Sequence, residues 1–117
     1  MSYPFNPGDD LIFQLESGFG LLRVLAVEGE GSETIWHLLA YDDFFPDVEA
    51  AEAALAGALL PVRKPHMALT NRAFERTPVA RLGNRSVTDD ELSAYQEWLG
   101  SDRPVSDRSA LLMLGVR

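Results

Sequence analysis

The 117-residue chain has no cysteine, one lysine and two histidines. Without cysteine it has no disulfide framework and no thiol chemistry, which fits a reducing compartment and a cytoplasmic protein. The histidines, His37 and His66, belong to no HExxH motif and to no spacing of two histidines with a carboxylate. We therefore expect neither a metal nor a cofactor. The residues around His37 predict a core histidine with a hydrogen-bond partner, and Pro65 predicts that His66 lies in a turn.

Long apolar runs are also missing. No stretch approaches the ~20 apolar residues that span a bilayer, and the N-terminus lacks the basic and apolar regions of a signal peptide. We therefore expect no membrane association. The composition, 46% hydrophobic and 24% charged, is typical of one folded domain over residues 1–117.

Basic residues are scarce in the first half of the chain. Residues 1–60 contain 11 acids and a single base, Arg23, whereas residues 61–117 contain nine bases and seven acids, so that the net charge is −8. This acidity argues against nucleic acid as a partner, because binding to phosphates depends on lysine and arginine.

The hydrophobic pattern predicts a three-strand meander over residues 10–42, with Gly20–Val27 as its middle strand. Short glycine-containing loops on both sides of this strand favour antiparallel hairpins. Residues 66–76 and 78–82 are predicted as further strands.

Two helices are predicted. Asp47 is a suitable N-cap for a helix from Val48 to Ala56, and Thr88 with Glu91 forms a capping box for a helix that ends at Gly100. The apolar C-terminal segment either packs on the core as a final strand or helical turn, or forms an edge in a homodimer. The expected fold class is α+β: a bent antiparallel sheet or partly open small barrel of five or six strands, with two helices.

Sequence motifs for catalysis are weak. There is no GxSxG elbow for a nucleophile, and the acid pairs Asp9-Asp10, Asp42-Asp43 and Asp89-Asp90 are expected to be solvated or to cap helices. The pattern favours a binding protein over an enzyme.

Asp42, Asp43, Phe44 and Phe45 form the first candidate site. The phenylalanines either cover an open edge of the core or, with the flanking acids, anchor a protein partner at the surface.

The second candidate site is basic. Arg72, Arg76 and Arg81 either pair with the acids of the first half or gather into an anion-binding site, for which the planar guanidinium is suited.

The first fifth of the chain contains a run of motifs typical of a small hairpin: Phe5, Gly8-Asp9, Leu11-Ile12-Phe13, Gly18-Phe19-Gly20 and Arg23-Val24-Leu25. Together they resemble the opening of bacterial immunity proteins of the Imm26 type, and many SH3-like small barrels begin with a similar hairpin. The resemblance implies a cytoplasmic protein that neutralises a toxin, often a basic one. An acidic surface would steer such a partner.

Three functions follow as hypotheses. The first is a non-catalytic protein of the immunity type, with Asp42, Asp43, Phe44 and Phe45 against a basic partner. The second is a small homodimeric accessory protein. The third is an anion-binding or enzymatic domain centred on Arg72 and Arg76.

Overall fold

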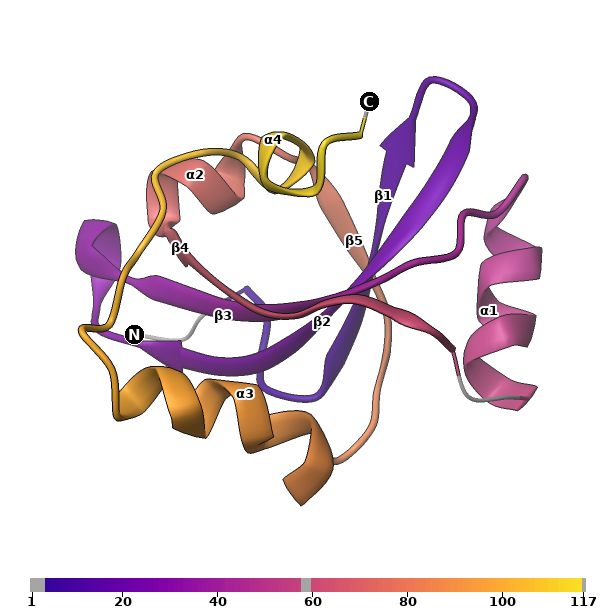
Figure 1. Ribbon diagram of the computed structural model, residues 1–117. Coiled ribbons are helices and arrows are strands. Elements are labelled where there is room, and N and C mark those ends of the chain that lie inside the picture. The colour runs from indigo at the N-terminus through magenta and orange to yellow at the C-terminus, as the bar shows by residue number, and fades with distance from the viewer. Residues whose placement is uncertain (1–3, 58–59, 117) are drawn as a thin grey trace.

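Five strands form one open antiparallel sheet with helices on both faces (Figure 1), in a computed structural model that describes residues 4–57 and 60–116. The strands lie in the order β4-β3-β2-β1-β5. Along the chain the elements are β1 (Asp9–Leu15), β2 (Gly18–Glu28), the 3-10 helix η1 (Gly31–Glu33), β3 (Ile35–Tyr41), α1 (Val48–Gly57), β4 (Val62–Thr70), α2 (Asn71–Glu75), β5 (Val79–Asn84), α3 (Asp89–Leu99) and α4 (Ala110–Leu114). The α+β prediction is confirmed, with two short helices more than expected.

The predicted meander is the centre of the sheet. β2 is its middle strand and pairs with β1 on one side and with β3 on the other. Bulges interrupt the register between Val24 and Ala26 and again between Leu38 and Ala40. Bulges bend a strand and increase its twist, and these bulges therefore curve the sheet that lies between the two layers of helices.

Phe13 and Gly20 show why the first hairpin is glycine-rich. They face each other across β1 and β2, and a Cβ atom added at Gly20 would lie 2.4 Å from Cζ of Phe13. The phenylalanine ring thus covers the glycine backbone, and no other residue fits at position 20 without displacing the ring.

Both faces of the sheet are buried. One face carries the larger apolar cluster, which includes Trp36 and Leu38 and is covered by Phe74 of α2 and Leu114 of α4. The opposite face packs against α1 and α3, and Figure 1 shows α3 on the side away from α2 and α4. The C-terminal segment therefore packs on the core as a helix, which is the first of its two predicted placements.

The strand predicted for residues 66–76 is only half correct. β4 ends at Thr70, whose hydroxyl accepts a hydrogen bond from the backbone N–H of Ala73 and so caps α2. In a strand, the adjacent residues Ala73 and Phe74 would point to opposite faces. Here both side chains are buried from one short helix. His66 lies within β4 and not in a turn.

Helix α3 begins where the capping box predicts. The Thr88 hydroxyl accepts from the Glu91 backbone, and the Glu91 carboxylate accepts from the Thr88 backbone. Val87 and Leu92 lie in the same apolar cluster, as expected for a hydrophobic staple. Within the described ranges, no helix combines the length and apolar character needed to cross a membrane.

Candidate functional site

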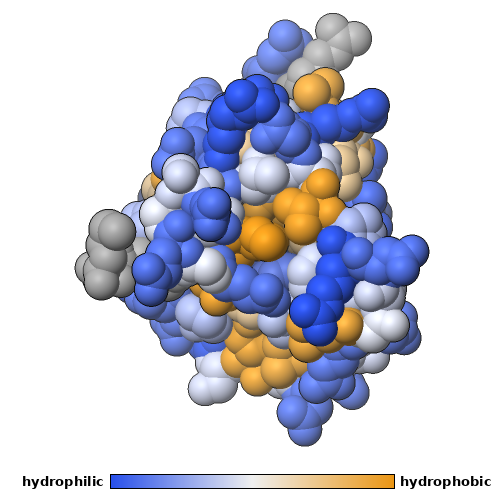
Figure 2. All heavy atoms as spheres, turned by 90° about the vertical axis from the view of Figure 1, so that its left-hand side faces the viewer, coloured by the Kyte–Doolittle hydropathy of each residue, from blue (hydrophilic) through white to orange (hydrophobic). Residues whose placement is uncertain are grey.

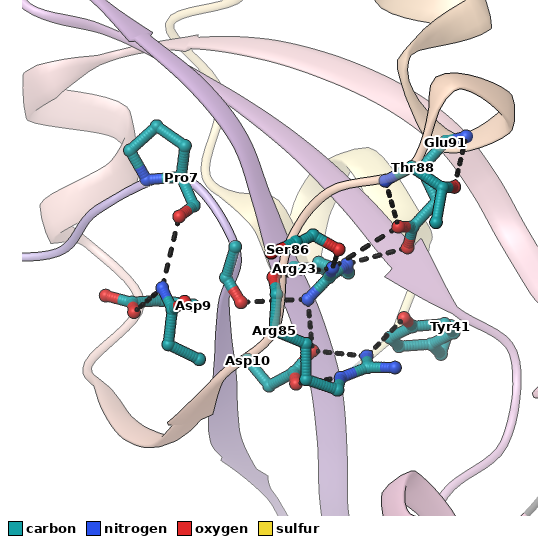
Figure 3. A network of polar contacts seen from close by, with 11 residues as sticks. Pro7, Asp9, Asp10, Arg23, Tyr41, Arg85, Ser86, Thr88 and Glu91 are labelled. Carbon is teal, nitrogen blue, oxygen red and sulfur yellow. Dashed lines mark hydrogen bonds and ion pairs between the residues drawn. The ribbon is translucent and has the colours of Figure 1, made fainter.

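A buried polar network joins the sheet to α3, and Arg23 stands at its centre (Figure 3). Only 1% of the Arg23 side chain is exposed. Its Nε donates to Glu91 Oε2 over 2.6 Å, and its Nη1 donates to Asp10 Oδ1 over 3.2 Å. Its Nη2 also donates to Glu91 Oε1 over 3.3 Å, and the guanidinium donates further to the backbone carbonyls of Gly8, Arg85 and Ser86.

The network continues through Asp10 to the surface. Arg85 binds both carboxylate oxygens of Asp10, at 2.7 and 2.8 Å, and also donates to the Tyr41 hydroxyl. Positive and negative groups therefore alternate from Arg85 through Asp10 and Arg23 to Glu91. The four charges sum to zero, which is the condition under which such groups can be buried.

This arrangement changes several pKa values. Hydrogen bonds from Arg85 to Asp10 raise the pKa of Arg85, and burial raises the pKa of Tyr41. Burial alone would raise the pKa of Glu91, but hydrogen bonds from the Thr88 backbone and Arg23 lower it below its usual value. Glu91 thus stays ionised under mildly acidic conditions. The network is a structural element, because its donors and acceptors satisfy one another.

A groove adjoins this network between α1 and α3. It consists of two adjoining hollows of about 400 and 490 Å³, which share Leu39, Val62, Asp90 and Glu91. Leu55 and Leu60 extend its apolar lining, and Glu97 adds a carboxylate at the α3 side.

The structure separates the two phenylalanines of the first candidate site. Phe45 exchanges two backbone hydrogen bonds with Phe19, and its side chain packs on the cluster under α1 and α3. Phe44 is 44% exposed. Phe45 therefore covers the core, as the first alternative predicts, whereas Phe44 lies at the surface and its role as an anchor for a partner stays a prediction.

The acids beside Phe44 are exposed as well. Asp42 lies 3.5 Å from Arg63 in a contact open to solvent, and Asp43 has no polar partner within the described chain. The Asp42 backbone N–H donates to the carbonyl of Pro61, next to Val62 of the groove. The acidic aromatic surface, defined as Asp42, Asp43 and Phe44, thus borders the groove.

The arginines of the second candidate site do not gather together. Arg72 and Arg76 both bind Asp107, the first through its carboxylate and the second through its backbone carbonyl at 3.0 Å. Hydrogen bonds from Arg72 and from the Thr70 hydroxyl lower the pKa of Asp107 to about 2. Arg81 lies elsewhere, 3.9 Å from Asp9 on β1. An acid already occupies the position that an anion would take.

The charge asymmetry of the sequence is partly internal. Arg81 and Arg85, from the second half of the chain, contact Asp9 and Asp10 respectively. Both acids are buried, although the sequence predicts that they are solvated. Arg63 reaches Asp42. Asp9 and Asp10 are therefore not available to a partner, whereas Asp42 and Asp43 are exposed.

Sequence reasoning missed the pairing of the two histidines. His37 Nδ1 and His66 Nε2 are 2.9 Å apart, and the rings are stacked with centroids 5.2 Å apart. Glu28 Oε1 lies 3.1 Å from His37 Nε2, outside hydrogen-bond geometry, and accepts a hydrogen bond from the Tyr95 hydroxyl. The two histidines are 29 residues apart in the chain, and no local pattern in the sequence links them.

A separate pocket, away from the groove, lies at the end of the molecule that carries η1 and α2. Figure 2 shows apolar side chains gathered there among polar ones. A pocket of about 180 Å³ is lined there by Phe5, Trp36 and Phe74, whose rings pack against one another. The mutual packing of these rings closes the wall of the pocket, so it offers a ligand little free aromatic surface.

No cluster of three or more histidine, aspartate or glutamate side chains able to hold a metal occurs in residues 4–57 and 60–116. Searches against family models, curated proteins and solved structures find no match for this chain.

Proposed function

We propose that the protein is a non-catalytic binding protein whose acidic aromatic surface engages a basic protein partner. The observation that carries the proposal is the exposure of Phe44, at 44%, beside the carboxylates of Asp42 and Asp43. An aromatic side chain that becomes buried supplies affinity, and neighbouring acids favour a cationic partner and speed association.

The groove next to this surface supports the same proposal. Its apolar floor and the carboxylates of Asp90 and Glu97 suit an apolar segment of the partner that carries basic residues. Phe45, although it is packed, fixes the position of Phe44 through its two backbone bonds to Phe19.

The resemblance of the first hairpin to bacterial immunity proteins implies that the partner is a toxin, met in the cytoplasm. A gene for a large secreted toxin next to the gene for this protein would support that class of partner. Neutralisation then consists of covering a basic surface of the toxin, and no group of this protein has to react.

The test is a pull-down of the partner with the wild-type protein and with a D42N/D43N variant, washed at increasing salt. We expect a basic protein to be retained, to elute as salt rises, and to be retained less by the variant, because screening and charge removal weaken the same attraction. Phe44→Ala should weaken retention about tenfold at every salt concentration, since burial of an aromatic anchor does not depend on salt.

A matched control carries the same kinds of change elsewhere. D102N combined with L112S removes an exposed acid and an exposed apolar side chain far from residues 42–44 in the chain, and it should bind like the wild type. Binding that is insensitive to salt and to D42N, D43N and F44A would contradict the proposal.

A further inference from the structure

The C-terminal half of helix α3 lies over two histidines of the sheet. The rings of Tyr95 and Trp98 lie 4.5 and 4.6 Å from the ring of His37, and 5.9 and 5.7 Å from that of His66. His37 is fully buried and Trp98 is 8% exposed. The C-terminal half of α3 therefore covers the His37–His66 pair, so that His37 is shielded from water while His66 is half-buried.

The geometry of the pair limits how many protons it can carry. An imidazolium has a hydrogen on both ring nitrogens, whereas a neutral imidazole has one donor and one acceptor. Because His37 Nδ1 and His66 Nε2 face each other at 2.9 Å, only one hydrogen fits between them. The docked pair therefore cannot be doubly protonated without moving apart.

The charges around the pair offer little compensation for a second proton. β2 supplies one carboxylate, Glu28, which already accepts a hydrogen bond from Tyr95 of α3. Arg103, which follows α3, and Lys64, two residues before His66 on β4, are both cations. A doubly charged pair would thus have one negative neighbour for two positive charges.

We propose that protonation of the His37–His66 pair releases the C-terminal half of α3 from the sheet. In the released state both imidazoles reach water and accept protons as free histidines do. The N-terminal turn stays attached through the contact between Arg23 and Glu91, which measures 2.6 Å in the docked helix.

The lowered pKa values of His37 and His66 agree with release of the helix on protonation. Burial lowers the pKa of His37, and burial together with His37 lowers that of His66 to about 4. The docked state thus binds fewer protons than the released state, so docking is strongest above about pH 6.5 and weakens as the pH falls toward 4. Each histidine raises the released population up to about tenfold per pH unit over this window.

Trp98 reports on the helix directly. In a W36F background, so that Trp98 is the remaining tryptophan, its emission is followed from about pH 7.5 to about pH 4.5, together with amide hydrogen exchange. We expect the emission to shift to the red and the protection factors of the amides of residues 95–99, which correct for the intrinsic pH dependence of exchange, to fall at least tenfold at the lower pH. Amides of β2 should keep their protection.

His66→Gln provides the matched variant, because the half-buried His66 can be replaced by a polar side chain that does not titrate. It should fold, and the pH dependence of the Trp98 signal should lose at least half of its slope. The proposal is overturned if the wild type shows no change over this range, if H66Q keeps the full pH dependence, or if β2 loses protection together with α3.

Discussion

Arg23 is the residue on which the polar interior depends. It is the only base among the first 60 residues, and it lies in the middle of an apolar strand. Its guanidinium satisfies two carboxylates and three carbonyls at once, which the three-donor ammonium of lysine could not do in this planar arrangement.

Replacing Arg23 should therefore cost much more than replacing an exposed arginine. We expect Arg23→Met to lower the free energy of unfolding by about 3 to 5 kcal/mol, because Asp10 and Glu91 lose a buried counter-charge. Arg81→Met, at a side chain that is 56% exposed and 3.9 Å from Asp9, should change it by less than about 1 kcal/mol. Urea unfolding followed by tryptophan emission measures both, and equal losses for the two variants would contradict the assigned role.

At the scale of elements, α3 combines a local signal with long-range attachments. Its capping box lies entirely within residues 88–91, yet the Glu91 carboxylate of that box also binds Arg23 on β2. The helix is thus positioned at its first turn by the sheet and at its end by the histidine pair.

The cap can be tested separately from the ion pair. Thr88→Ala should destabilise the protein by about 1 kcal/mol, because the Glu91 N–H loses its acceptor, whereas Thr88→Ser keeps the hydroxyl and should stay close to the wild type. Thermal unfolding of the three proteins decides this, and a serine variant as unstable as the alanine variant would rule out the hydroxyl as the stabilising group.

At the scale of the whole molecule, repulsion among the excess acids opposes the attraction within the ion pairs. The net charge is −8, and the ion pairs Arg63–Asp42 and Arg72–Asp107 are open to solvent. Exposed pairs contribute little, whereas excess charge of one sign destabilises a compact chain through self-repulsion.

Salt should therefore stabilise this protein at neutral pH. Adding about 0.2 M NaCl reduces the screening length below 10 Å, so the melting temperature should rise as repulsion between acids weakens. Differential scanning calorimetry at two salt concentrations gives the answer. A falling melting temperature would mean that the ion pairs contribute more than the repulsion removes.

Local patterns in the sequence determined several elements. The alternation in β1, the short glycine-containing loops and the Thr88 capping box each depend on residues close together in the chain, so the meander and α3 could be predicted. The same reasoning placed Asp42, Asp43 and Phe44 at the end of a strand, next to the surface where they are found.

Only the tertiary structure decided which charged and polar groups meet. Arg23 with Glu91, Asp10 with Arg85, and His37 with His66 are brought together by the pairing of distant strands and the docking of α3. Nothing in the neighbourhood of each residue in the chain specifies its partner, and the burial of Asp9 and Asp10 follows from that pairing. Helix α2 stands where the second half of a strand was expected, because Ala73 and Phe74 both pack into the cluster on one face of the sheet, which the local pattern does not specify.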